Sequence, residues 1–209
     1  MPILESTYVA DLIDHLGVPP ERIRMRPIPG TATEEDVVRT RPLCELIDGV
    51  LVEKALGFWE SRVAVILAYY LEAFFETNDI GFTLGEGGMQ RIEHGQVRIP
   101  DVSVYLWSRF PNRQLTLEQI LDKVADICVE VLSPTNTSKE MQRKRQEHFA
   151  AGAKLMWFVD PEKRTVEVFT SPKQSRVLTE TDVLDGGDVL PGFTVSIKTW
   201  LERAGKRAP

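Results

Sequence analysis

A short apolar run with one carboxylate in it constrains this chain more than any other feature. Residues 127–132 read ICVEVL, and Glu130 is the one charged residue among them. A bounded apolar run of this length is typical of a buried strand. A carboxylate taken out of water is costly unless it is paired or holds a metal. The sequence therefore predicts a buried strand in which Glu130 has a specific partner.

The order of the other patterns predicts an α/β fold, with a mixed sheet flanked by the long helix on one side and helix 138–151 on the other. Asp48-Gly49, between two apolar runs, predicts a β-hairpin, and His94-Gly95 predicts a second turn. The expected helices are 7–16, a two-turn helix within 31–38, 57–79, 116–123 and 138–151. The expected strands lie within 42–55, 80–106, 126–132, 154–160 and 165–170, and a final strand and helix come before residue 205.

The bulk composition is that of a globular protein. The chain has 209 residues, 43% of them hydrophobic, which allows a core without disulfides or structural metal. Cys44 and Cys128 lie in apolar runs and are expected to be small buried hydrophobes in a reducing compartment. No stretch is long and apolar enough to span a bilayer, and no signal peptide is evident, so a cytoplasmic protein with no membrane contact is expected.

The net charge of −6 argues against a broadly basic surface for nucleic acid. It leaves room for a local basic cleft, for which KEMQRKR over 139–145 is the candidate, with Lys163 and Arg164 as additional cations.

Three charged residues fall where a mixed sheet would bring them together. Asp101 begins a half-buried strand in which apolar and polar side chains alternate, and Glu130 is centred in the next strand. Lys144 shares a helical face with Met141 and His148. If the two strands pair, Asp101 and Glu130 approach each other, and the helix lays Lys144 over them.

Two carboxylates and a lysine in this arrangement favour a hard-cation site. Mg²⁺ takes one or two carboxylates together with waters and phosphate oxygens, and Mn²⁺ can replace it. Such a metal stabilises charge on a phosphodiester and activates water, while Lys144 orients that water or neutralises developing charge. The alternative is that Glu130 is simply paired with a buried Arg or Lys.

The same residues resemble a known nuclease pattern. Pro-Asp at 100–101, EVLSP at 130–134 and a lysine on the next helix are similar to the PD-(D/E)XK nuclease superfamily. More narrowly, six motifs in order resemble the Uma-two type of restriction endonuclease, a bacterial family long classed as a domain of unknown function. These motifs are ELIDG (45–49), VRIPDVSV (97–104), VEVLSPTN (129–136), K…HFAAG (144–152), WFVDP (157–161) and LPGF (190–193).

The resemblance implies a restriction-endonuclease-like domain over 41–209, preceded by an N-terminal arm with short helices over 1–40. It implies Asp101 and Glu130 as metal ligands, Lys144 as a catalytic lysine and Glu45 as an additional acid, whose alternative role is turn formation. The superfamily's usual lysine position, two residues after Glu130, holds leucine here, and Lys144 takes its place.

The chain also departs from the family at two further places. His148 stands where family members often have tyrosine, and we expect it to be a residue of the polar helix face rather than a metal ligand. Glu60 and Ser61 stand where many members have a histidine early in the long helix.

The implied function is a Mg²⁺-dependent endonuclease that hydrolyses phosphodiester bonds of DNA, with a homodimer needed to cut both strands. Two alternatives remain: a nuclease-like domain that binds nucleic acid or a protein partner without cutting, and a purely structural domain with paired acids.

Overall fold

The computed structural model describes residues 9–55 and 57–205. Its central feature is a six-stranded mixed sheet in the order β11-β10-β9-β8-β6-β3. The strands β8 and β9 are parallel and the other neighbours antiparallel. These strands are β3 (Gly81–Leu84), β6 (Val102–Leu106), β8 (Ile127–Val131), β9 (Leu155–Asp160), β10 (Thr165–Ser171) and β11 (Gln174–Leu178).

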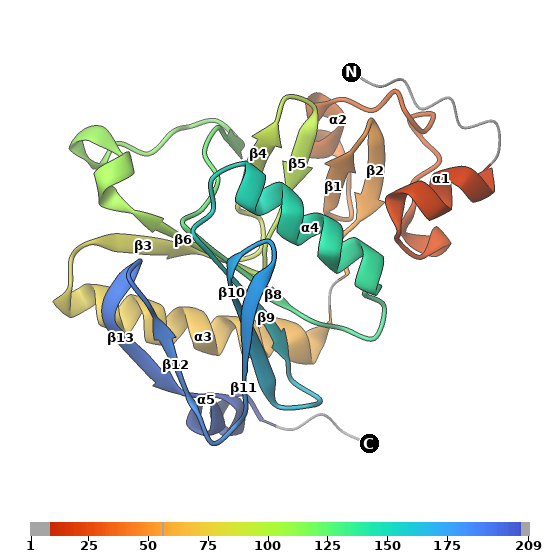
Figure 1. The fold of residues 1–209 in the computed structure, drawn as a ribbon. Helices are drawn as coiled ribbons and strands as arrows, with labels where there is room; N and C mark the ends of the chain where they lie inside the picture. The colour runs from red at the N-terminus through yellow and green to blue at the C-terminus, as the bar shows by residue number, and fades with distance from the viewer. Residues whose placement is uncertain (1–8, 56, 206–209) are drawn as a thin grey trace.

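Helices cover both faces of this sheet, which confirms the predicted α/β class (Figure 1). The helix α3 (Phe58–Thr77) and the C-terminal helix α5 (Ile197–Ala204) pack on one face, together with the hairpin of β12 (Val183–Gly186) and β13 (Leu190–Ser196). The helix α4 (Ser138–Ala150) lies on the other face and joins the parallel strands β8 and β9.

Alternation along β8 decides which side chains meet α4. Val129 and Val131 point into the core beneath α3, whereas Cys128 belongs to the cluster beneath α4. Glu130 has the same parity as Cys128, so it also faces α4. Strand β8 is buried along its whole length, as its apolar sequence predicts.

A second sheet of five strands lies beside the first, in the order β2-β1-β5-β4-β7. Asp48 and Gly49, with φ of 50° and 72°, form the predicted turn between its first two strands. The strands are β1 (Cys44–Ile47), β2 (Val50–Glu53), β4 (Met89–Glu93), β5 (Gln96–Arg98) and β7 (Ile120–Leu121).

The N-terminal arm packs against this second sheet. Its helix α1 (Val9–Leu16) begins within the predicted range, whose residues 7 and 8 lie outside the described part of the chain. A short 3-10 turn (Pro20–Arg22) and helix α2 (Glu34–Arg39) follow. Apolar side chains of the arm share one buried cluster with the hairpin: Leu12, Leu16, Val18, Ile23, Ile47, Val50 and Val52.

One predicted element is wrong. Residues 116–123 do not form a helix; instead Ile120 and Leu121 form β7, which pairs in parallel with β4. Leu117 is fully exposed, so the segment offers no continuous apolar face to hold a helix against the core. Two short 3-10 turns, Trp107–Arg109 and Pro111–Arg113, precede it.

Both cysteines are free and buried, as predicted. Within residues 9–55 and 57–205, no helix has the length and apolar character needed to cross a membrane.

Candidate active site

Strand pairing brings Asp101 to Glu130. Strands β6 and β8 are antiparallel with Val102 opposite Val129, so Asp101 lies just before the paired region and beside Glu130. The Asp101 backbone N–H donates to the Val129 carbonyl at 3.0 Å, and the Val131 N–H donates to Asp101 Oδ2 at 2.6 Å. Asp101 is thereby fixed by backbone on both sides, and its Oδ1 remains for another partner.

Glu130 is a buried carboxylate with one oxygen satisfied and one not. Its Oε2 accepts a hydrogen bond from Lys144 Nζ at 3.1 Å, whereas Oε1 is buried without a hydrogen-bond partner. Burial raises the pKa of Glu130 to about 7, against the opposing effect of the Lys144 and Lys54 ammonium groups. A buried carboxylate oxygen without a donor is unusual, and a cation or a water molecule would satisfy it.

Lys144 reaches the strands from α4. Thr137 caps this helix by accepting a hydrogen bond from the Glu140 N–H at 3.0 Å, as the sequence predicts. The Lys144 ammonium lies 3.1 Å from Glu130 and 3.3 Å from Glu45 Oε1. Burial disfavours the charged amine, but Glu130 and Glu45 outweigh it and hold the pKa of Lys144 above its ordinary value.

Glu45 is fully buried on β1 and is saturated with donors. The Ile99 N–H donates to its Oε1 at 3.1 Å, and Arg98 Nη1 donates to its Oε2 at 2.9 Å. Although burial opposes ionisation, Lys144 and Arg98 hold the pKa of Glu45 well below its usual range. Glu45 is therefore an ionised anchor beneath Lys144.

Lys54 is a further member of the site, and sequence analysis missed it. It follows β2 directly, and its Nζ lies 2.8 Å from Asp101 Oδ1 and 4.0 Å from Glu130 Oε2. Its side chain is 3% exposed. The signal available in the sequence was parity, because Lys54 continues the inward-facing series of Val50 and Val52 on the hairpin strand that follows Glu45.

Comparison with known proteins gives the family. The model of the family described as "Uma2: Putative restriction endonuclease" matches residues 34–198. The chain belongs to the Uma2 family. This confirms the resemblance noted in the sequence, and it leaves catalytic activity to experiment.

A solved structure of the same kind confirms the fold. The crystal structure of a putative nuclease belonging to DUF820, from Anabaena variabilis, matches with a TM-score of 0.69 at 20% sequence identity. The match covers 79% of this chain and 93% of that one. No curated protein matches the sequence.

The residue four positions after Lys144 on α4 is buried. His148 has no exposed surface, so its predicted place on a polar helix face is wrong. Its Nδ1 lies 3.4 Å from Cys128 Sγ, and its Nε2 has no hydrogen-bond partner. Burial, with the nearby Arg98 and Lys144, lowers the pKa of His148 to about 3, so the ring is neutral.

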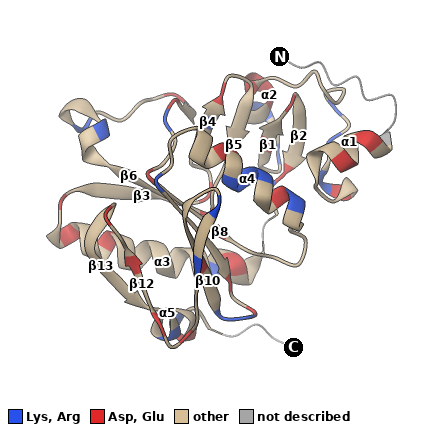
Figure 2. Ribbon diagram, in the orientation of Figure 1, with Lys and Arg blue, Asp and Glu red and all other residues tan. Residues whose placement is uncertain are grey.

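Most cations of the candidate basic cleft over 139–145 are ion-paired. Figure 2 shows Lys and Arg residues along α4, and three of these four cations have an acidic partner, whereas Arg145 lies over the Phe169 ring at 4.6 Å. Lys139 binds Asp14 at 2.9 Å, and Arg143 binds Asp48 at 2.6 Å. Lys144 is buried in the site.

The two cations proposed beside that cleft are paired as well. Lys163 binds Asp160 at 2.8 Å, and Arg164 binds Glu180. These cations therefore do not form a free positive surface.

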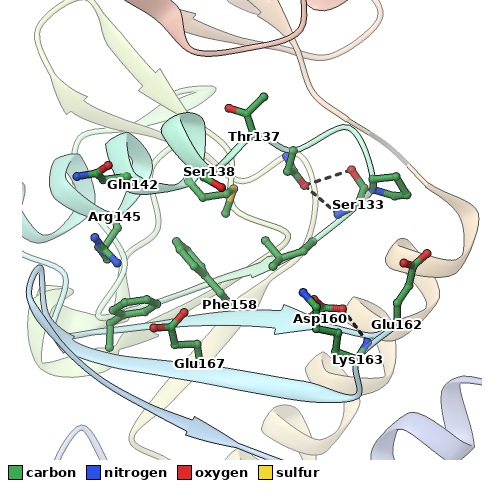
Figure 3. A pocket seen from close by; sticks show the side chains of 15 residues that line it. Ser133, Thr137, Ser138, Gln142, Arg145, Phe158, Asp160, Glu162, Lys163 and Glu167 are labelled. Atoms are coloured by element: carbon green, nitrogen blue, oxygen red, sulfur yellow. Dashed lines mark hydrogen bonds and ion pairs between the residues drawn. The ribbon is translucent and has the colours of Figure 1, made fainter.

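A cavity of about 680 Å³ lies beside α4, away from the acidic pair (Figure 3). Thr137 and Ser138 border it at the start of the helix, and Phe158 and Glu167 border it from the sheet. Asp101, Glu130, Lys144 and Glu45 do not line it. The cavity is lined by both acidic and basic side chains, and none of its described lining residues is a base placed beside a nucleophile. The site formed by Asp101, Glu130 and Lys144, called the strand site below, is therefore the better candidate for a catalytic centre.

The strand residues offer two carboxylates to a divalent cation. Within the described part of the chain, no group of three or more His, Cys, Asp or Glu side chains could hold a metal ion. Two carboxylates, Asp101 and Glu130, remain, and Mg²⁺ needs no more than one or two with waters. The unpartnered Oε1 of Glu130, on the strand that pairs next to Asp101, fits that requirement.

Proposed function

We propose that this Uma2 protein is a metal-dependent endonuclease that hydrolyses phosphodiester bonds of DNA. One observation carries the proposal: a buried, unpartnered carboxylate oxygen of Glu130 lies on the strand beside Asp101, with the Lys144 ammonium 3.1 Å from the other oxygen. Membership of a family described as restriction endonucleases supports the reaction class.

Asp101 and Glu130 are the residues that would hold Mg²⁺ or Mn²⁺. A bound cation of this kind supplies Lewis-acid stabilisation of phosphate charge and an activated water. Backbone hydrogen bonds with Val129 and Val131 fix Asp101, so its position does not depend on a flexible partner side chain. Because the pKa of Glu130 is raised, a cation bound beside it would favour the ionised carboxylate over the protonated form.

Lys144 would hold the attacking water or offset charge that develops on the phosphate. Glu45 would act through Lys144 and not on the substrate, because both of its oxygens are occupied by Lys144, Arg98 and the Ile99 N–H. Glu45 is thus proposed as a positioning residue. A homodimer would place two such sites on a duplex.

The assay is cleavage of supercoiled and linear DNA with Mg²⁺ or Mn²⁺. Asp101→Asn, Glu130→Gln and Lys144→Met should each lower the rate at least about a hundredfold, since each removes a group assigned to metal or water. Asp160→Asn, which alters a paired carboxylate on the same sheet, is the matched control and should cut as the parent does. A parent without metal-dependent cleavage would contradict the proposal.

The second candidate is a nuclease-like domain that binds nucleic acid or a protein partner without cutting. Lys54 favours it, because an ammonium already neutralises Asp101. The same assay separates the two candidates when DNA binding by the parent is measured alongside it.

A further inference from the structure

The Lys54 ammonium lies where a divalent cation would meet the acidic pair. Asp101 Oδ2 is engaged by the Val131 N–H, so Oδ1 is its free oxygen, and Lys54 Nζ binds that oxygen at 2.8 Å. The same nitrogen lies 4.0 Å from Glu130 Oε2. A cation that ligates both carboxylates must approach these oxygens to about 2.0–2.1 Å.

Buried cations already face the pair. The carboxylates Asp101, Glu130 and Glu45 face the cations Lys54, Lys144 and Arg98, all of them buried. The Lys54 pKa is held above its ordinary value by Asp101, Glu130 and Glu45, in spite of burial, so the amine stays charged. A divalent ion that enters beside the Lys54 and Lys144 ammonium groups gains less attraction than it would at two carboxylates without such neighbours.

We propose that Lys54 is a tethered counter-ion that competes with the divalent cation and must leave Asp101 before the metal binds. This inference rests on the metal site of the proposed function. Lys144 cannot take this part, because it is held between Glu130 and Glu45 and does not contact Asp101.

The Lys54 side chain can move away from Asp101. Its four-carbon stem is flexible, and it follows the last residue of β2 instead of lying within the strand. Glu86, on the exposed loop between β3 and β4, interacts electrostatically with both Asp101 and Lys54. Its carboxyl offers the displaced ammonium a new partner at the surface.

The test is a calorimetric titration of the metal-free protein with Mn²⁺ alone. Lys54→Met keeps most of the side chain and removes its charge, and it should bind Mn²⁺ roughly tenfold or more tightly than the parent. Lys163→Met changes the net charge equally at an exposed ion pair and should bind as the parent does. Equal or weaker binding by folded Lys54→Met overturns the inference, as does the absence of Mn²⁺ binding in both proteins.

A second measurement uses the parent protein and does not depend on the variant folding. Amine-reactive labelling with mass spectrometry should show Lys54 protected without metal and labelled at saturating Mn²⁺, while Lys144 stays protected in both. If Lys54 remains protected with Mn²⁺ bound, it is not displaced, and the inference fails.

The outcomes separate this inference from the proposed function. Equal Mn²⁺ affinity with metal-dependent cleavage removes the role of Lys54 and keeps the nuclease. Tighter binding by Lys54→Met with no cleavage by any variant keeps the competing lysine and removes the nuclease.

Discussion

Two buried glutamates in the site show how residue-scale surroundings divide similar groups between different roles. Glu45 receives donors from Arg98, Lys144 and a backbone N–H, and its pKa falls. Glu130 is equally inaccessible but has one oxygen without a donor, and its pKa rises. Both carboxylate oxygens of Glu45 therefore have their donors in the folded protein, whereas the ionised form of Glu130 can still be stabilised by an added cation.

The buried His148 makes a pH prediction at the same scale. Its pKa is about 3 in the folded protein and 6.5 ordinarily, so the unfolded chain binds the extra proton between these values. Above pH 6.5 this residue does not lower the free energy of unfolding. As the pH falls from 6.5 towards 3, protonation of the unfolded chain lowers that free energy. Between pH 7 and pH 5 the loss is about 2 kcal/mol.

Denaturant unfolding of the parent and His148→Gln at a series of pH values checks this. Because glutamine does not titrate, the variant should lose about 2 kcal/mol less than the parent between pH 7 and pH 5. Parallel stability curves for the two proteins would show that His148 is not held neutral by burial.

At the scale of elements, the start of α4 is tied to the N-terminal arm. Arg22 forms a bidentate pair with Glu140, at 3.0 and 2.9 Å, and both side chains are nearly inaccessible. Thr137 Oγ1 also donates to the Gly17 carbonyl. The helix that delivers Lys144 is thus anchored by residues outside the matched family region of 34–198.

Removing Arg22 should be costly because it leaves the Glu140 carboxylate buried and unpaired. We expect Arg22→Met to lower the free energy of unfolding by about 3–5 kcal/mol, and Arg22→Met with Glu140→Gln to recover part of that loss. Arg39→Met breaks an exposed pair with Glu35 on α2 and should change stability by less than about 1 kcal/mol. Urea unfolding of all four proteins gives these values, and a small effect of Arg22→Met would mean that Glu140 is not enclosed.

The same helix shows what the sequence could and could not predict. Its start at Thr137 and its inward Lys144 follow from capping chemistry and helical spacing, which are local. The partner of Glu140 does not follow, because Arg22 is 118 residues away and the capping-box spacing instead favours a local bond for the glutamate. Lys54 was missed for the same reason: its partner, Asp101, is 47 residues away and lies just before β6 of the other sheet.

Over the whole molecule, the fold class and the family were predictable, because apolar strand patterns and the order of the motifs are local properties of the sequence. The proposed boundary between an arm over 1–40 and a domain over 41–209 remains a prediction. The arm shares an apolar cluster with the first hairpin, and Glu34 of α2 pairs with Arg91 of β4 at 2.6 Å. These contacts predict that the arm and the sheets unfold together.

A divalent cation bound at the strand site should stabilise this whole unit. Binding to the folded state alone at a concentration one hundred times its Kd adds about 2.7 kcal/mol. For a chain of 209 residues this corresponds to a rise in Tm of about 5–10 °C, measurable by calorimetry with Mn²⁺. Asp101→Asn should lose the rise, because its neutral amide is a poor ligand for the cation, and Asp160→Asn should keep it. A rise that persists in Asp101→Asn would place the metal elsewhere in the molecule and leave Asp101 as a partner of Lys54 alone.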